Sequence, residues 1–163
     1  MTPNPDSTHR GFRRREFLRV CGAVSAAGML NVLMAPRASA TPQSMQAQID
    51  AIVGKAKVQP GRVHLDIPQL VENGNTVPMN VRVDSPMKPD DYVKAIHVFN
   101  EKNPNSRVMS AVLSPRAGRA EISTRIKLAD TQQVIAIAQM SDGSFWSGSA
   151  DVIVTIAACL EDL

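Results

Sequence analysis

The feature that most constrains this chain is the period-two alternation of apolar and polar residues through its C-terminal half. The alternation is cleanest over residues 119–128, where Ile122 and Ile126 alternate with charged side chains such as Glu121 and Arg125. Successive side chains of a strand point to opposite faces of a sheet, so the pattern predicts a strand with one buried face. Six further runs predict strands, at residues 76–84, 92–99, 109–113, 134–140, 145–149 and 151–156. We therefore expect an all-β protein, a two-sheet sandwich of immunoglobulin-like type with about seven strands.

A short N-terminal helix is expected before the strands. Residues 41–57 place apolar side chains at helical spacing, with Ser44 as a candidate N-cap and Gly54 as a candidate end. Turn residues such as Asn73-Gly74-Asn75 and Ser141-Asp142-Gly143 separate the later apolar runs. Aromatic residues make up only 4% of the chain, so the core must be built mainly from aliphatic side chains.

The first 40 residues have the pattern of a removable export signal. The residues that fill the places of the twin-arginine signal are Arg14, Arg15, Phe17, Leu18 and Arg19. A mildly apolar segment over residues 20–34 follows, and the small residues of Ala38-Ser39-Ala40 predict cleavage after Ala40. The segment is similar to a twin-arginine signal, and the alternative is a general secretory signal with a coincidental arginine run.

This signal predicts the location of the mature protein and its division into parts. The apolar segment has about 15 residues and a membrane-spanning helix needs about 20, so we expect no stable membrane anchor. Cys21 is not a lipidation site, because Arg19 and Val20 are not the small residues that such a site requires. We expect a periplasmic protein with a signal at residues 1–40, a sandwich at 41–156 and a C-terminal arm at 157–163.

The charge of the mature chain excludes one class of partner. Of the 18 Lys and Arg residues, six lie in the leader, which leaves 12; of the 15 Asp and Glu residues, two lie in the leader, which leaves 13. A near-neutral domain has no electrostatic basis for binding nucleic acid, so we expect no nucleic-acid partner.

The mature chain shows no motif for a cofactor or a metal. His64 and His97 are not at metal-ligand spacing, and the sequence contains no cysteine pair, no dinucleotide-binding glycine motif and no P-loop. The twin-arginine pathway exports folded proteins, so a passenger without a cofactor needs another reason to fold first. We expect that reason to be a partner protein that folds with it.

Cys159 is the one cysteine that remains after the leader is removed. It lies just beyond the last expected strand, and an unpaired cysteine in an oxidising compartment calls for an explanation. Three remain open: a small buried hydrophobic residue, an intermolecular disulfide, or an exposed thiol used for covalent chemistry. The nearby carboxylates of Glu161 and Asp162 disfavour the thiolate through charge repulsion.

Several blocks of the mature chain resemble SoxY, the carrier subunit of the periplasmic thiosulfate-oxidation (Sox) system. The blocks are Ile67–Pro78, Asp84–Met87, Asp91–Phe99, Glu101–Pro104, Ser123–Ile126, Met140–Ser144 and Val154–Ile156 before Cys159. The resemblance implies a carrier rather than an enzyme, with no catalytic residue and no cofactor beyond a sulfur intermediate held covalently on Cys159. It also implies a heterodimer with a SoxZ-like subunit, and Sox enzymes that dock on the C-terminal arm.

The arm departs from the family pattern, in which two glycines stand on each side of the cysteine. Here the tail is Ala157-Ala158-Cys159-Leu160-Glu161-Asp162-Leu163, so the cysteine is kept and the four flanking glycines are absent. Glycine gives a chain flexibility and a slim profile, which alanine and leucine reduce. Two alternatives to the carrier therefore stay open. One is a SoxY-like paralogue that pairs with a SoxZ-type subunit but carries different cargo or none, and the other is a thiol enzyme that uses Cys159.

Overall fold

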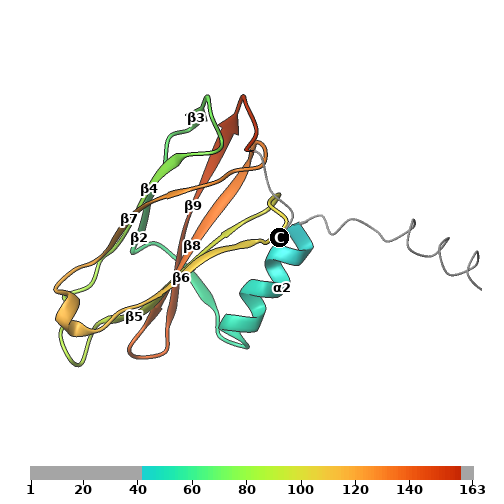
Figure 1. Ribbon diagram of the computed structural model, residues 1–163. Helices are drawn as coiled ribbons and strands as arrows, with labels where there is room; N and C mark the ends of the chain where they lie inside the picture. The colour runs from blue at the N-terminus through green and yellow to red at the C-terminus, as the bar shows by residue number, and fades with distance from the viewer. Residues whose placement is uncertain (1–41, 159–163) are drawn as a thin grey trace, which may run out of the picture. The chain divides into compact units, whose positions relative to one another are not determined.

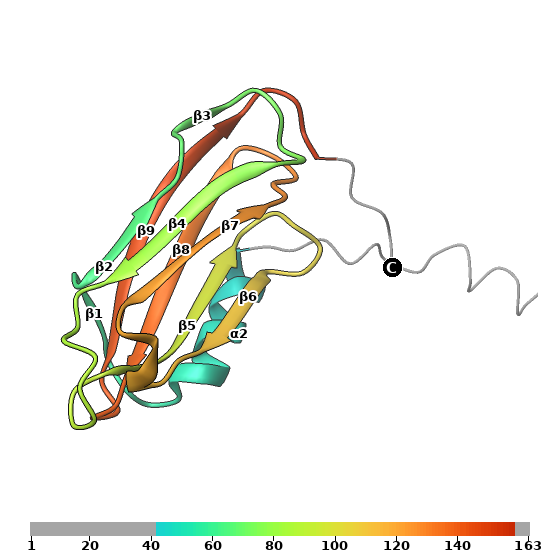
Figure 2. The same cartoon turned by 60° about the vertical axis from the view of Figure 1, so that its left-hand side comes forward.

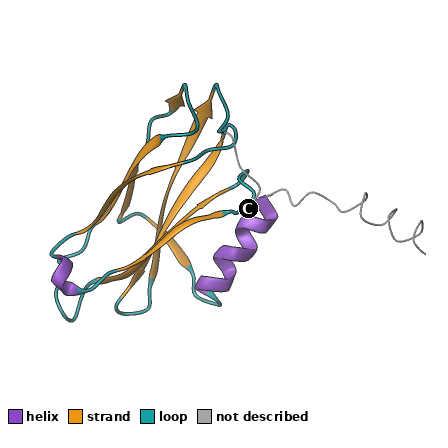
Figure 3. Cartoon of the chain, viewed as in Figure 1, coloured by secondary structure: helices purple, strands orange, loops and turns teal. Residues whose placement is uncertain are grey.

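The computed structural model describes residues 42–158, which form nine strands, one α-helix and one turn of 3₁₀ helix (Figure 3). In chain order the elements are α2 (Pro42–Val53), β1 (Val58–Pro60), β2 (Val63–Asp66), β3 (Leu70–Val71), β4 (Val77–Val83), β5 (Val93–Asn100), β6 (Arg107–Val112), η1 (Pro115–Ala117), β7 (Ala120–Ile126), β8 (Gln132–Met140) and β9 (Phe145–Val154).

The strands form two sheets that face each other (Figures 1 and 2). The larger sheet has the strand order β1-β9-β8-β5-β6, and β3 adds to it by pairing with β9. The smaller sheet has the order β2-β4-β7. Neighbouring strands are antiparallel except that β1 and β3 each run parallel to β9. The expected all-β, immunoglobulin-like sandwich with a short N-terminal helix is confirmed.

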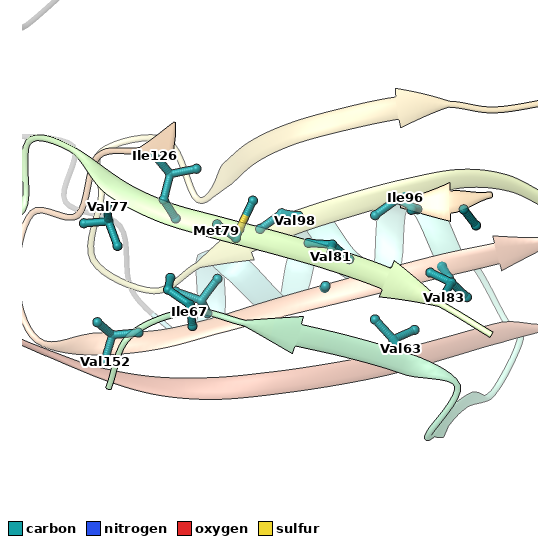
Figure 4. Close-up of a cluster of buried hydrophobic side chains, with 14 of the residues drawn as sticks. Val63, Ile67, Val77, Met79, Val81, Val83, Ile96, Val98, Ile126 and Val152 are labelled. Carbon is teal, nitrogen blue, oxygen red and sulfur yellow. The ribbon is translucent and has the colours of Figure 1, made fainter. Parts of the chain in front are cut away.

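The core between the sheets follows from the alternation in the sequence (Figure 4). In β4 the buried positions include Val77 and Val81, both fully buried, whereas Pro78 and Arg82 point outward and are exposed. Burying a valine or isoleucine side chain contributes about 2 kcal/mol, so a face of such residues favours one strand register. A shift of one residue would turn the whole buried set toward water.

Helix α2 covers part of the outer face of the larger sheet (Figure 1). Its buried residues Met45, Ile49 and Val53 pack against aromatic and aliphatic side chains of β5, β8 and β9. The helix is shorter than the expected 41–57, because Gly54 adopts a positive φ of 64° and ends it. Among the described residues, no helix is long and apolar enough to cross a membrane.

The helix start also differs from the expectation. Ser44 is not the N-cap, because the helix already includes Pro42, a residue type favoured in a first turn. The Ser44 hydroxyl lies 3.2 Å from the hydroxyl of buried Ser106, which joins the helix to the loop before β6. Ser44 therefore has a tertiary role rather than a capping one.

Two differences concern the strands. The two runs at 145–149 and 151–156 form one continuous strand, β9, because β8 pairs with it without a break from Phe145 to Val152. Strands β1, β2 and β3 were not expected, since runs of two to four residues are too short for a periodic pattern. Gly148 stands where β2 crosses β9, and a Cβ there would collide with the backbone oxygen of Val63.

The run at 134–140 was expected to be a central strand, and β8 confirms it. β8 lies between β9 and β5, and both of its faces are covered. Val134 and Ala136 face the smaller sheet, whereas Ile137 faces α2. A strand covered on both faces needs continuous apolar character, which accounts for the sequence of this run.

Candidate functional site

The C-terminal end of β9 is the part of the fold that leads to Cys159. β3 lies beside this end of β9 and pairs with it in parallel, Leu70 with Ile153 and Val71 with Val154 (Figures 1 and 2). The Ile153 amide donates to the oxygen of Gln69 at 2.8 Å. The chain therefore leaves the sandwich from a strand that is fixed on both sides, by β8 and by β3.

Directly after β9, Thr155 is hydrogen-bonded to the residues at the end of β3. Its amide donates to the Val71 oxygen at 3.0 Å, and its hydroxyl lies 3.4 Å from that oxygen and 3.2 Å from the Glu72 oxygen. The preceding amide, that of Val154, donates to the hydroxyl of Thr131 at 3.0 Å. The chain is thus still held to the body one residue past the strand.

A second set of contacts holds residues 156–158, and we call Gly74, Leu128, Ile156 and Ala158 the arm seat. The Gly74 amide donates to the Ile156 oxygen at 2.8 Å, and the Ala158 amide donates to the Leu128 oxygen at 3.0 Å. The Leu128 amide donates in turn to the Gly74 oxygen at 2.9 Å, which closes the set. Ala158 is only 9% exposed, so the residue before Cys159 is packed against the body of the protein.

Gly74 is required by space rather than by its backbone conformation, since its φ is not in the left-handed region. A Cβ at this position would collide with the Leu128 oxygen, and would lie 2.9 Å from the Ala158 nitrogen and 3.1 Å from the Ile156 oxygen. Real Cβ atoms essentially never lie within 3.0 Å of such atoms, so a side chain at 74 would require the backbone of Leu128 and Ala158 to shift.

A polar network supports Leu128 from the loop after β5. The Asn103 side chain accepts from the Ala129 amide at 2.9 Å and donates to the Lys127 oxygen at 2.8 Å. The buried Gln132 side chain donates to Asn103 at 3.0 Å and accepts from the Lys102 amide at 2.8 Å. These bonds fix the backbone on both sides of Leu128, so the seat is built on a rigid loop.

An ion pair closes the same network at its exposed rim. The Lys102 ammonium lies 3.0 Å from an Asp130 carboxylate oxygen. That hydrogen bond, together with one from the Thr131 amide, lowers the pKa of Asp130. Both side chains are about half exposed, so the pair adds little stability and mainly orients the loop.

Three exposed aliphatic side chains lie on the segments that lead to the arm seat. Leu70, Ile153 and Ile156 are 62%, 55% and 65% exposed, and they belong to β3, to β9 and to the short segment between β9 and the arm. Exposed aliphatic side chains beside one another are typical of surfaces that contact other proteins. Among the described residues, one further large hydrophobic side chain is exposed to this degree, Val112 on the edge strand β6.

Neither histidine lies at the end of the sandwich that holds the arm seat. His97 pairs with Ile137, which pairs with Ser147, seven residues before Val154. At the rise of an extended strand this separation is about 23 Å. His97 bonds instead to the Ser110 hydroxyl at 2.8 Å, and burial, with the nearby charge of Arg107, lowers its pKa.

His64 is engaged elsewhere, in an exposed pair with Asp84. Its Nε2 lies 2.7 Å from an Asp84 carboxylate oxygen, and this hydrogen bond lowers the pKa of Asp84. His64 pairs with Arg82, near the C-terminal end of β4. The arm seat lies at the other end of the same sheet, where Val77 begins β4 and pairs with Ile126 at the end of β7. The described residues therefore supply no histidine base beside the arm, and no three His, Cys, Asp or Glu side chains among them gather as metal ligands would.

The residues expected to carry function lie outside the described part of the chain. They are Arg14, Arg15, Phe17, Leu18 and Ala40 of the expected leader, and Cys159. The structure adds Gly74, Leu128 and Ala158, which the sequence did not single out. The sequence indicated this position only through Asn73-Gly74-Asn75, which predicted a turn. Nothing in the spacing of residues linked that turn to Ala158, more than 80 positions later in the chain.

Comparisons with known proteins identify the family. The model of the family "Sulfur oxidation protein SoxY" matches residues 49–159. The structure is similar to that of the sulfur carrier protein SoxY from Chlorobium limicola f thiosulfatophilum, with 26% identity and a TM-score of 0.60 over 71% of this chain and 100% of that one. A search of curated proteins gives no match.

A second solved structure shares the fold alone. The superoxide reductase (neelaredoxin) from Ignicoccus hospitalis is 12% identical, with a TM-score of 0.52 over 71% of this chain and 94% of that one. At this identity the likeness shows only that the sandwich is common to both. The family match, by contrast, spans β1 to β9 and continues to Cys159. The chain therefore belongs to the SoxY family of sulfur oxidation proteins.

Proposed function

We propose that this chain is the periplasmic sulfur carrier of a Sox thiosulfate-oxidation system, and that Cys159 holds the sulfur intermediate covalently. The observation that carries the proposal is that the family match extends to residue 159 and so includes the one cysteine left after the expected signal is removed. The similar structure from Chlorobium limicola is itself a sulfur carrier protein. The carrier has no catalytic residue of its own in this proposal, and Sox enzymes act on the cargo at the arm.

The formation of the bond between the Cys159 thiol and its sulfur cargo requires an electron acceptor, which a partner must supply. Joining a thiol to an inorganic sulfur anion through a new sulfur–sulfur bond releases one proton and two electrons. The carrier needs no cofactor for this step, provided that a partner oxidoreductase takes the two electrons. A sulfur–sulfur bond is also broken by thiol reductants, which makes the attachment testable.

Intact-protein mass spectrometry of protein purified from sulfur-oxidising cells tests the proposal. We expect a species heavier than the chain that begins at Thr41, and we expect a thiol reductant to remove the added mass. Peptide mapping should place the adduct on Cys159. Protein that carries no reducible adduct during thiosulfate oxidation would contradict the carrier function.

The absence of a reducible adduct would favour a second candidate function, that of a SoxY-like paralogue that carries different cargo or none. The observation in its favour is the arm, in which two alanines, a leucine and a glutamate stand in the places of the family's four flanking glycines. Ala158 packs at 9% exposure, and Glu161 and Asp162 add negative charge beside the thiol. A bulky, acidic arm is less suited to presenting an anionic cargo in a narrow active site.

A SoxZ-type subunit is the partner that we propose. The expected twin-arginine signal implies export in the folded state, and a subunit without its own signal would leave the cytoplasm only when bound to this chain. We expect the two chains to elute together on size-exclusion chromatography after co-expression, at the mass of a heterodimer. Elution of this chain as a monomer beside a folded SoxZ-type subunit would exclude the pairing.

A further inference from the structure

Asn100, the last residue of β5, places a polar side chain inside the sandwich. It pairs with Val134 of β8, and Val134 belongs to the core between the two sheets. Residues that pair across an antiparallel ladder point to the same face, so the Asn100 side chain also points between the sheets. Its exposed fraction is 0%. A carboxamide therefore stands within a layer of apolar side chains.

The side chain of Asn100 has no hydrogen-bond partner in the described part of the chain. Its Oδ1 and its Nδ2 are both buried, and neither bonds to a residue among 42–158. A carboxamide can donate two hydrogen bonds and accept two, so those residues use none of this capacity. A dry amide gives up its bonds to water and gains none, which would raise the unfolding equilibrium constant about tenfold or more. Buried polar groups of folded proteins are instead paired, with protein atoms or with ordered water.

Asn100 has little freedom to find a partner elsewhere. Its backbone is held on both sides, because it pairs with Val134 and its amide donates to the Ser106 oxygen at 2.8 Å. An asparagine side chain has two rotatable bonds, so its polar atoms stay close to the strand and cannot extend to the surface as a lysine does. The longer side chain of Gln132, on the same face of β8 as Val134, does reach the neighbouring loop and bonds to Asn103. A partner for Asn100 must therefore lie inside the core.

Two other buried polar residues lie close to Asn100. They are Ser106 and Gln132, which are 1% and 4% exposed. The Ser106 oxygen accepts from the Asn100 amide, and Gln132 lies two residues before Val134 in β8. These three are the buried polar residues of the described part of the chain. The polar groups of the interior thus gather at one place, where β5 ends and β8 begins.

Ser106 and Gln132 retain hydrogen-bonding capacity for a ligand. The Gln132 side chain donates once, to Asn103, and accepts once, from the Lys102 amide. Within the described contacts it therefore keeps one donor and one acceptor site. The Ser106 hydroxyl shares one hydrogen bond with the Ser44 hydroxyl at 3.2 Å, which leaves at least one acceptor site. A buried water needs about two to four polar partners, and this cluster offers them.

We propose that Asn100 binds a buried water molecule between the two sheets, beside Ser106 and Gln132. The ligand is water rather than a cation, because the three side chains are neutral and a dehydrated cation in the core needs charged ligands. Water both donates and accepts, so one molecule can bond to the Asn100 carboxamide and to a neighbouring group. The site does not depend on the carrier function proposed for Cys159.

Magnetic relaxation dispersion of water oxygen tests the site, because it counts the water molecules that stay in a protein longer than the protein takes to tumble. The test variant is Asn100→Leu, since leucine has the branched shape of asparagine but cannot bond to water. The matched control is Asn80→Leu. Asn80 lies on the outer face of β4, where its Nδ2 donates to Glu121 at 3.0 Å and to Ser123 at 2.7 Å. Both variants remove one carboxamide, but Asn100→Leu alone removes it from the interior.

We expect Asn100→Leu to hold at least one long-lived water fewer than the wild type, and Asn80→Leu to hold the same number as the wild type. A measurement on the wild type covers the case in which Asn100→Leu does not fold. Nuclear Overhauser effects should connect a long-lived water to the side-chain amide hydrogens of Asn100.

Three results would overturn the proposal. The first is an equal number of long-lived waters in the wild type and in Asn100→Leu. The second is an equal loss in Asn100→Leu and Asn80→Leu, because the lost water would then not belong to the interior site. The third is the absence of any contact between water and the Asn100 amide hydrogens in the wild type, which would show a dry carboxamide.

Discussion

Cys159→Ser is expected to abolish the reducible adduct completely. A serine hydroxyl has nearly the size of a thiol but cannot form a sulfur–sulfur bond, so the cargo would have no attachment point. The residue lies beyond the last strand and beyond the buried Ala158, so the unfolding temperature should stay within about 2 °C of the wild type. The measurement is intact-protein mass spectrometry of wild-type and variant protein purified from the same thiosulfate-oxidising cells.

The chain provides a matched control in its second cysteine. Cys21 lies in the expected signal, so Cys21→Ser should leave both the mass of the mature protein and its adduct unchanged. An adduct that persists in Cys159→Ser would place the cargo on another residue and contradict the assignment. Loss of the adduct in Cys159→Ser, together with normal loading in Cys21→Ser, is the expected pair of results.

The double substitution of Arg14 and Arg15 by lysine is expected to stop export and leave the precursor in the cytoplasm. Lysine keeps the charge but loses the planar, five-donor guanidinium, so a receptor that recognises paired arginines would lose its contacts. The measurement is cell fractionation followed by N-terminal sequencing, which should find a mature chain that begins at Thr41 only in the wild type.

Arg13→Lys is the control for this prediction. Arg13 adjoins the pair but lies outside the two places that the signal pattern requires, so its replacement should permit export and cleavage after Ala40. Normal cleavage of the wild-type chain in cells that lack the twin-arginine translocase would contradict the assignment and favour a general secretory signal.

The long strands of both sheets could be predicted from the sequence because each carries its own pattern. The alternation at 119–128 identified β7, and the continuous apolar run at 134–140 identified β8. The short strands could not be predicted in this way. β3 has two residues, and only its pairing with β9 makes Leu70 and Val71 a strand.

The ends of the helix and strands were also predicted only where a local residue pattern marks them. Gly54 was a candidate end for the helix at the sequence level, and its positive φ ends the helix in the structure. The division of β9 into two runs was wrong, because a polar stretch before Val152 interrupts the apolar pattern while the pairing with β8 continues through it. A local pattern reports which side chains are buried, whereas backbone pairing depends on the neighbouring strand.

The sequence by itself determined the class of fold and the family resemblance, because alternation, motif order and composition are local properties. Only the tertiary structure brought Gly74, Leu128 and Ala158 together, through hydrogen bonds between loops far apart in the chain. It also decided that Gly74 must be glycine for reasons of space, a constraint that its turn motif did not reveal. Contacts of this kind depend on how two sheets and their loops pack, and no spacing within a single segment encodes them.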